Sequence, residues 1–260
     1  MIELYHWEPN MFSLKPLIAL HEKGLAFKSH YVDLLAFEQY ALPDIGSQLE
    51  VRHNPEGDGP VLVDRGVVMT ESAFINLYLD EAYPETPLRP ADAASRWRVL
   101  MWARFANEVV APAVSTLGCH KYLSPYLAAR KRSDIEAAIA RMPTLELRQA
   151  WQAALDNSYT DDLLQDSHRK AALAVTKVED ALKSSQWLAG ASYSLADIDL
   201  FSLMHTISDL SPAVLANAPK TKTWLSTIAG RAAVKTAFST SRTGKPGQSF
   251  VPGPEHSRWG

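Results

Sequence analysis

The chain has 260 residues, 47% of them hydrophobic, and a formal net charge of -3. This length can hold two domains with real cores, the charge gives no reason to expect nucleic acid as a partner, and the single cysteine, Cys119, excludes an internal disulfide. Because no apolar run approaches the ~18 residues of a membrane span, and because the first residues read as a strand and not as a secretory signal, we expect a soluble cytoplasmic protein with no membrane partner.

The first 32 residues read as a strand, a helix and a second strand. Residues 2–5 have a strand pattern, and the apolar residues after position 13 have helical spacing. Lys23 and Gly24 form a stop signal for that helix, and a second strand is expected over 27–32. Ser13 therefore stands at the start of the first helix.

The stretch 54–72 reads as a turn, a hairpin and the start of a helix. Pro60 stands directly before a short apolar run, where a proline can begin a strand but cannot continue a central one. The Asp-Arg-Gly sequence at 64–66 then turns the chain into a second apolar run at 67–69. Small polar and acidic groups at 70–72 are N-terminal signals for a helix. Such a helix end presents unpaired amides that can hold the carboxylate of a small ligand.

The second half of the chain reads as helical. Three prolines within 84–90 cannot form a helix interior and mark an interdomain linker, and from Ala93 onward the pattern is helical. Between 118 and 167 the chain is long and polar, with scattered aromatic residues. The segment 241–260 is rich in Gly and Pro. It is expected to be irregular, and two alternatives stay open: disorder, or docking over the cleft with Phe250 and Trp259 as anchors.

A capping pattern lies near the end of the helical half. Ser194 and Asp197 have the spacing of a helix N-cap and its partner three residues on, and Tyr193 and Ile198 have that of a hydrophobic staple. A further helical pattern covers 224–234. This capping pattern predicts that a helix begins directly after Ser194.

In this order, the patterns resemble those of the glutathione S-transferases, and the resemblance covers almost the whole chain. It implies an α/β N-terminal thioredoxin-like domain at 1–83, a linker at 84–92, an all-α C-terminal domain at 93–240 and an irregular tail at 241–260. It also implies glutathione as the co-substrate, no metal, and a dimer formed by two identical chains or with a paralogue.

The resemblance implies roles for residues around glutathione. It places the catalytic hydroxyl at Ser13, where a hydrogen bond to the sulfur favours the thiolate over the thiol. The other interpretation, that Ser13 only caps its helix, stays open. In the family, a proline with a cis peptide bond lies beside the ligand and a Glu-Ser pair holds its γ-glutamyl end. The positions that match the glutathione-binding residues are Gln39, Gly59, Pro60, Glu71 and Ser72.

Within the family, the chain looks like the bacterial glutathione-dependent β-etherases, which act on lignin-derived aromatic dimers. The similarity is carried by 10–17, 37–39, 114–118 and the long insert that follows. It implies that the glutathione thiolate attacks the carbon bearing an aryl ether and releases a phenolate. The bulky substrate needs an apolar, aromatic-lined pocket, although apolar residues at these positions are also typical of a core. The candidate walls are Trp7, Pro9, Phe12, Arg104, Val110, Ala111 and Ser115.

One turn departs from the family pattern. A lysine or glutamine followed by valine usually precedes the proline, whereas this chain has Asp58 and Gly59 there. An acidic Asp58 repels the glycyl carboxylate of glutathione, so Gln39 or His53 would have to supply the missing contact. A second interpretation follows, in which the chain is a transferase-like subunit with a weakened site and the partner of an active paralogue. A general glutathione-conjugating transferase is the third.

The sequence offers one other candidate nucleophile. Cys119 is followed by His120, but no recognisable partners accompany them, so a buried cysteine beside a surface histidine is the favoured interpretation. The eight histidines show no metal-ligand spacing, and we expect no metal site.

Overall fold

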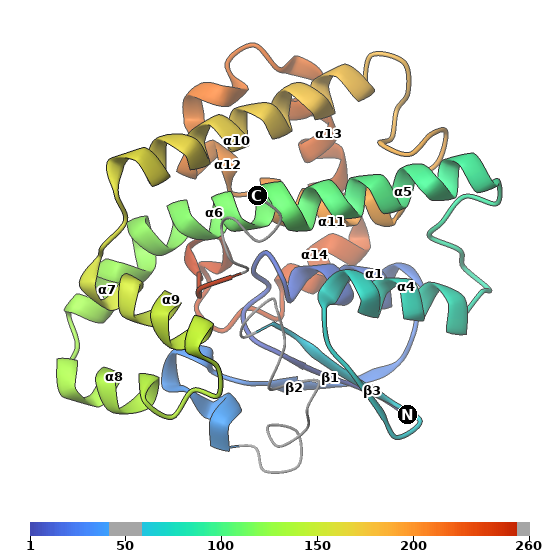
Figure 1. Cartoon of the computed structure of the whole chain (residues 1–260). Helices are drawn as coiled ribbons and strands as arrows, with labels where there is room; N and C mark the ends of the chain where they lie inside the picture. Colours follow the sequence, from blue (N-terminus) through green and yellow to red (C-terminus); the bar gives the residue numbers. More distant parts are fainter. Residues whose placement is uncertain (42–58, 254–260) are drawn as a thin grey trace.

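The computed structural model describes residues 1–41 and 59–253 (Figure 1). The predictions made for His53, Asp58 and Trp259 lie outside these residues. Within them, the strands belong to the first 69 residues, and helices form most of the chain from Ala93 onward.

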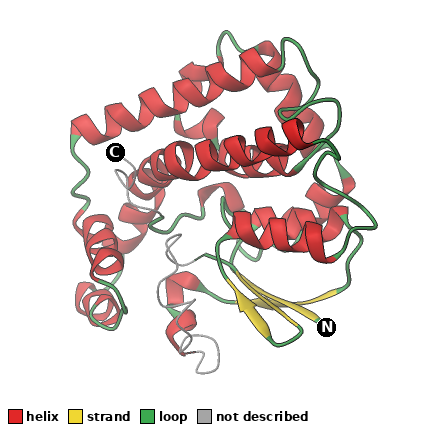
Figure 2. Cartoon of the chain, turned by 45° about the vertical axis from the view of Figure 1, so that its right-hand side comes forward, coloured by secondary structure: helices red, strands yellow, loops and turns green. Residues whose placement is uncertain are grey.

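Four strands form one mixed sheet. They are β1 Ile2–His6, β2 Phe27–Tyr31, β3 Val61–Asp64 and β4 Val67–Met69, in the spatial order β2-β1-β3-β4. β1 is parallel to β2 and antiparallel to β3, which is antiparallel to β4. The helices α1 Leu14–Glu22 and α4 Ser72–Ala82 lie on one face of the sheet (Figure 2), and the short 3-10 helices η1 Leu34–Ala36 and η2 Glu38–Ala41 follow β2. The predicted N-terminal α/β unit is confirmed.

The predicted hairpin is β3 and β4. Its two-residue turn has positive φ at both Arg65 (51°) and Gly66 (81°), the backbone that matches the twist of the paired strands. Asp64 is buried at the end of β3 and accepts hydrogen bonds of 2.7 Å from the hydroxyls of Tyr78 and Tyr83. These two bonds fasten the hairpin to α4.

In the residues described, the second part of the chain consists of helices and loops, with one isolated β-bridge between Trp187 and Gly190. It begins with a continuous helical run in which two π-helical segments, η3 and η4, interrupt the α-helix. The run is α5 Ala93–Phe105, η3 Ala106–Val110, α6 Ala111–Gly118, η4 Cys119–Leu123 and α7 Ser124–Ala128. The later elements are α8 Arg132–Ile139, α9 Leu145–Asp156, α10 Asp161–Ala181, α11 Leu195–Met204, α12 Ile207–Leu210, η5 Pro212–Leu215, α13 Pro219–Ala229, α14 Ala232–Phe238 and η6 Pro246–Gln248.

α11 is the central helix of this part. All of its residues are buried, and the predicted capping box is confirmed: Ser194 and Asp197 exchange hydrogen bonds between side chain and backbone. Asp197 also accepts from the Trp224 indole (2.9 Å) and the Leu188 backbone (3.0 Å). The box therefore joins α11 to α13 and to the loop before α11.

Polar and aromatic contacts join the two parts of the chain. Arg231, just before α14, forms a bidentate ion pair with Glu22 at the end of α1, with N···O distances of 2.5 and 2.8 Å. In the segment between the parts, Arg89 donates to the buried Asp80 (2.8 Å). Phe37 packs on Trp151 of α9, with ring centroids 5.0 Å apart. The long insert thus rests on the segment after β2.

The peptide bond before Pro60 differs from the expectation. No peptide bond among the described residues is cis, so this bond is trans and the implied cis bond is not present. The trans isomer of an isolated X–Pro bond is favoured by about 0.5–1 kcal/mol, so a cis bond persists only where its surroundings hold it.

The segment 241–253 is docked, as one of the two open alternatives predicted, and Phe250 is buried.

None of the described helices combines the length and the apolar character that crossing a bilayer requires.

Candidate functional site

At the start of α1, the side chain that caps the helix is Asn10 and not Ser13. The Asn10 side-chain oxygen accepts from the backbone N–H groups of Phe12 (3.1 Å) and Ser13 (3.0 Å), whereas the Ser13 side chain makes no capping hydrogen bond. The Ser13 hydroxyl oxygen accepts from the backbone N–H of Trp7 at 3.3 Å. Within the described residues it donates to no acceptor, so its proton is available to a ligand at the N-terminus of α1. That end carries a partial positive charge.

Pro60 lies beside the loop that carries Ser13. β3 pairs antiparallel with β1, with Val61 opposite Tyr5, so the same register brings Pro60 opposite the end of β1. Gly59 is half-buried and precedes it directly. Gly59 and the loop that leads to Ser13 therefore lie at the same end of the paired strands β1 and β3.

The start of α4 holds a strained residue. Glu71 has φ 65° and ψ 99°, a conformation that non-glycine residues rarely adopt and that costs of the order of 1–3 kcal/mol. Its carbonyl accepts the first helical hydrogen bond from Ile75 (2.8 Å). Ser72 follows as the first residue of α4 and is fully buried. Backbone strain of this kind persists where the surroundings or a function hold it.

Gln39 has an unsatisfied side-chain amide. It lies in η2, and both its oxygen and its nitrogen are buried without a hydrogen-bond partner in the residues that the structure describes. A buried amide without partners is costly, because its hydrogen bonds to water are lost and not replaced. A polar ligand beside η2 would satisfy it.

The predicted substrate walls fall into two groups. Phe12, in the β1–α1 loop, and Ser115, on α6, both touch Gly253: a Cβ built on that glycine would lie 3.1 Å from the Phe12 ring and 3.0 Å from the Ser115 hydroxyl. Trp7, Pro9, Val110 and Ala111 are buried on the same loop and the same helical run.

Arg104 lies apart from the other predicted walls. It pairs with Glu108 one turn along the helix (2.8 Å), its side chain is 62% exposed, and it borders a separate surface hollow with Trp97 and Phe105. An ion pair at this helical spacing keeps the guanidinium at the surface.

Cys119 is not an activated nucleophile. It is fully buried in η4, and desolvation raises the pKa of its thiol to about 12. His120 shares a hydrogen bond of 2.9 Å with Asn157 at the surface. In the described part of the chain, no cluster of His, Cys, Asp and Glu is arranged to hold a metal ion.

Sequence reasoning missed three polar residues around the site. Asn10 caps α1; an Asn shortly before a helix was an available signal. Glu8 is buried in the same loop and receives hydrogen bonds from the segment 241–243. Lys15 is buried and donates to Asn107 of η3 (2.8 Å), which joins α1 to the helical run. Nothing local in the sequence marks Glu8 or Lys15, because their partners lie far along the chain.

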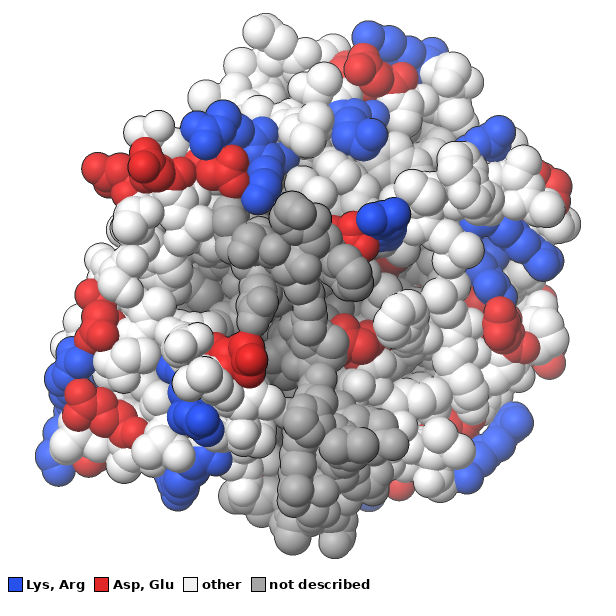
Figure 3. Space-filling model, in the orientation of Figure 1, with Lys and Arg blue, Asp and Glu red and all other residues white. Residues whose placement is uncertain are grey.

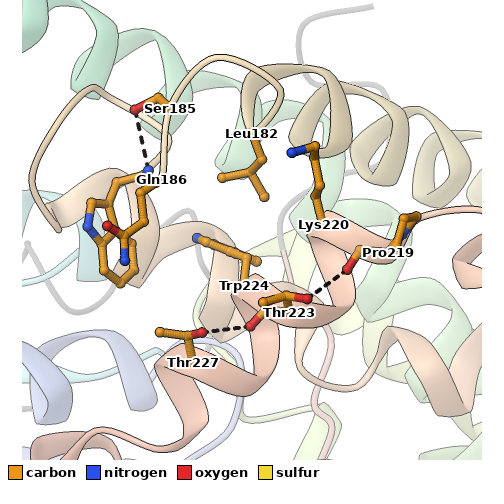
Figure 4. Close-up of a pocket in the computed structure, with 9 residues that line it drawn as sticks. Leu182, Ser185, Gln186, Pro219, Lys220, Thr223, Trp224 and Thr227 are labelled. Carbon is orange, nitrogen blue, oxygen red and sulfur yellow. Dashed lines mark hydrogen bonds between the residues drawn. The ribbon is translucent and has the colours of Figure 1, made fainter.

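Other surface features do not compete with this site. A hollow of about 370 Å³ lies between the end of α10 and α13 (Figure 4), but the hydroxyls of Thr223 and Thr227 are used inside α13, and the Trp224 indole is used by Asp197. On the face shown in Figure 3, basic and acidic side chains alternate. This mixture fits the small net charge and forms no single-sign patch in the part of that face described.

Family models match both halves of the chain. The model for the N-terminal domain of glutathione S-transferases matches residues 11–82, and the model for their C-terminal domain matches residues 141–232. Together these matches span more than half of the sequence.

Several known proteins are similar over almost the whole chain. Protein LigF from Sphingobium sp. (strain NBRC 103272 / SYK-6) is 32% identical over 249 residues, which cover 93% of this chain and 94% of LigF. The crystal structure of β-etherase LigF from that strain superposes with a TM-score of 0.81 at 31% identity, covering 92% of this chain and 99% of the other. Glutathione transferase F7 from Populus trichocarpa shares the fold, with a TM-score of 0.68, 23% identity and coverage of 96% and 100%.

Proposed function

Because the chain belongs to the glutathione S-transferase family, we propose that it cleaves β-aryl ethers of lignin-derived aromatic dimers, with glutathione as the co-substrate. Membership makes it a glutathione transferase enzyme; the particular reaction is the proposal. Its strongest support is the similarity to a β-etherase over nine-tenths of both chains. The Ser13 hydroxyl adds to it, because its proton is free to bind a sulfur at the N-terminus of α1.

Glutathione would bind along the edge formed by β3, α4 and η2. The backbone of Gly59 before Pro60 pairs with the cysteinyl part of the peptide, and Glu71 and Ser72 hold the γ-glutamyl end. Gln39 then donates to or accepts from the glycyl end, which would satisfy its buried amide. A related fold from Pseudomonas fluorescens Pf-5, 20% identical with a TM-score of 0.66, was crystallised with two glutathione molecules bound.

The sulfur would be activated by two groups at the start of α1. A free thiol has a pKa of ~8.5, and only the thiolate attacks. A hydrogen bond from a neutral donor to a charged acceptor contributes about 1.5–3 kcal/mol, and the helix end about 0.3–1 kcal/mol. Together they would lower the thiol pKa by roughly 1.5–3 units, which makes the thiolate abundant at neutral pH.

The thiolate would then displace the aryl ether. Its lone pair forms the carbon–sulfur bond while the carbon–oxygen bond breaks, and the bonding electrons leave on the phenolate oxygen, which takes a proton from water. A ketone on the neighbouring carbon activates the displacement, and in-line attack inverts the ether-bearing carbon. Positioning supplies much of the rate, because thiolate and phenolate are already a good nucleophile and a fair leaving group.

The aromatic substrate would be held between the β1–α1 loop and the helical run. Phe12 and Ser115 both lie beside Gly253, so the two walls are close to each other. The proposed pocket also includes Trp7, Pro9, Val110 and Ala111. Arg104 is left out because its side chain is directed to the surface with Glu108.

One experiment separates the three functions under consideration. The purified chain is mixed with glutathione and a Cα-keto β-aryl ether, phenol release is followed, and glutathione binding is measured by calorimetry. The proposal expects phenol release and binding. Binding with turnover of small electrophiles only would identify a general conjugating transferase. Absence of glutathione binding would favour the weakened subunit that serves an active paralogue.

A further inference from the structure

His6, the last residue of β1, is a buried histidine that the proposed reaction does not use. Its side chain is only 3% exposed, and both ring nitrogens make short hydrogen bonds. Nδ1 lies 2.6 Å from the carbonyl oxygen of Trp7, and Nε2 lies 2.7 Å from the hydroxyl of Ser29 on β2. The imidazole therefore joins the sheet to the start of the loop that carries Ser13.

The two partners of His6 determine which ring nitrogen carries the proton. A carbonyl oxygen can only accept, so Nδ1 donates to Trp7. Burial has the largest effect on the imidazole and lowers its pKa below the ordinary value, so the ring is neutral at neutral pH. Nε2 of a neutral ring is then an acceptor, and the Ser29 hydroxyl donates to it. His6 is therefore the Nδ1–H tautomer.

Trp7 is held through both of the peptide groups that adjoin it. In the group between His6 and Trp7, the carbonyl accepts from the Val32 N–H (2.9 Å), and the N–H donates to the Ser13 hydroxyl oxygen (3.3 Å). In the group between Trp7 and Glu8, the carbonyl accepts from the His6 imidazole. Each peptide group is planar, so fixing both planes fixes the φ and ψ angles of Trp7. His6 fixes the second plane.

The N–H of Trp7 in turn directs the proton of Ser13. A hydroxyl has one proton to donate and two lone pairs that accept. Because one lone pair accepts from Trp7, the hydroxyl proton points away from that N–H group and is left for a ligand sulfur. A hydrogen bond of 3.3 Å is at the long end of the normal range, so a small displacement of Trp7 would break it.

We propose that His6 is a positioning residue for the reaction, and that its imidazole acts through the Trp7 backbone to keep the Ser13 hydroxyl directed at the glutathione sulfur. This inference rests on the proposed function, because it requires glutathione bound at the N-terminus of α1. His6 takes no part in the bond changes.

Two replacements separate the two ring nitrogens of His6. The side-chain amide nitrogen of asparagine lies about where Nδ1 lies in histidine, and that of glutamine about where Nε2 lies. His6→Asn therefore keeps a donor for the Trp7 carbonyl, whereas His6→Gln keeps only a group that reaches Ser29. His205→Gln is the matched control, since Nδ1 of His205 also hydrogen-bonds a backbone carbonyl, that of Ser202 (2.9 Å), at the end of α11.

The variants are compared by the pKa of bound glutathione and by the turnover of the Cα-keto β-aryl ether. His6→Gln should raise this thiol pKa by about 0.5–1 unit, because a misdirected hydroxyl stabilises the thiolate less. At a pH below the thiol pKa, kcat should then fall about three- to tenfold, with KM for glutathione changed less than about twofold. His6→Asn should stay within about twofold of the wild type in kcat, and His205→Gln should match it.

A double variant distinguishes positioning from a loss of structure. If His6 acts through Ser13, His6→Gln should cause no further shift of the thiol pKa in the Ser13→Ala background, where the hydroxyl is gone. General damage to the fold would instead add to the effect of Ser13→Ala. Nitrogen NMR of the wild-type imidazole is an independent check, and it should show the proton on Nδ1.

Three results would overturn the inference: additive shifts in the double variant, equal effects of His6→Asn and His6→Gln, or a wild-type ring protonated on Nε2 alone. The last needs no variant, so it decides even if the His6 variants fold poorly. Failure of the wild type to bind glutathione would remove both this inference and the proposed function. Coupled shifts of the thiol pKa without ether cleavage would sink the proposed reaction and leave the role of His6 in place.

Discussion

At the scale of single residues, two side chains near α1 divide tasks that one serine often performs. Asn10 accepts the hydrogen bonds that cap the helix, and the Ser13 hydroxyl is left to bind a ligand. The interpretation that Ser13 only caps the helix therefore has no hydrogen bond to support it. The polar neighbours of the site also differ in kind: the Gln39 amide is unsatisfied in the described residues, whereas Glu8 is fully satisfied.

Because Asn10 caps the helix and Ser13 is left to bind a ligand, two alanine variants should affect different properties, one mainly stability and the other mainly activity. Asn10→Ala should lower the free energy of unfolding by about 1 kcal/mol, because the cap is lost, and Ser13→Ala should lower it by less. Ser13→Ala should instead raise the pKa of bound glutathione by about 1–2 units and reduce kcat/KM about 10- to 100-fold. Urea unfolding gives the first quantity, and thiolate ultraviolet absorbance against pH gives the second. Equal stability losses and an unshifted thiol pKa would contradict the assignment.

Gln39 should matter for binding and not for folding. Gln39→Ala removes a buried amide that lacks partners, so the stability of the free chain should stay within about 0.5 kcal/mol or rise. Glutathione affinity should fall about 5- to 20-fold if the amide binds the peptide. Calorimetry with glutathione checks this, with Gln152→Ala on α9 as the control, because the Gln152 amide donates to Asp156 at the surface. Unchanged affinity would remove Gln39 from the binding site.

At the scale of elements, the sequence predicted those whose signals are local. The Asp-Arg-Gly turn has its two central residues at positive φ, and the pair Ser194 and Asp197 forms the capping box. The π-helical segments η3 and η4 were not predicted, and the sequence left open whether the segment 241–253 is docked, because both depend on contacts between distant residues. Gly118 shows the difference. Its neighbours along the chain predict a helix, but the requirement for glycine at this position comes from the Phe250 ring, more than 100 positions away, which a Cβ would overlap.

The capping box of α11 predicts a pH dependence. Burial raises the pKa of Asp197 to about 6, although four hydrogen bonds oppose the shift. A carboxyl with a raised folded pKa adds stability fully below its unfolded value, ~3.9, and loses it as the pH rises through the folded value. The stability difference between wild type and Asp197→Asn should therefore shrink by about 3 kcal/mol between about pH 3 and pH 7.

Urea unfolding at intervals between about pH 3 and pH 7, a range that extends about one unit beyond both pKa values, measures this difference. Asp92, which caps α5 from the surface, serves as the control, since its pKa is lowered by hydrogen bonds from Ser95. For Asp92→Asn the difference from wild type should change in the opposite sense, growing as the pH rises. A pH-independent difference for Asp197→Asn would show that Asp197 does not titrate in this range.

At the scale of the whole molecule, the exposed apolar side chains point to a second copy. Of eight large hydrophobic residues exposed in the described part, three lie on one short stretch of α5: Trp97 (61% exposed), Leu100 and Met101. The hollow beside them, of about 500 Å³, is lined mainly by apolar surface from α5 and α10. Exposed apolar patches of this kind mark interaction sites. We propose that this face forms a homodimer.

Trp97→Glu tests the proposed dimer. A charge in an apolar interface should weaken association by about 2–3 kcal/mol, which is roughly 30- to 150-fold in the dissociation constant. Light scattering across a concentration series measures it, and Leu145→Glu, an exposed leucine on α9, is the control. A wild type that stays monomeric throughout would reject the homodimer and leave a paralogue as the partner to seek.

The buried carboxylate of Glu8 also constrains the order of folding. Its partners in the segment 241–243 lie 233 to 235 positions further along the chain, so these hydrogen bonds cannot form until nearly all of the chain has been synthesised. Contacts with such a long sequence separation form late and slowly. The sheet and α1 can assemble early on a ribosome, but the loop that carries Ser13 reaches its final shape in one of the last steps. Catalytic competence should therefore appear after the bulk of the secondary structure during refolding.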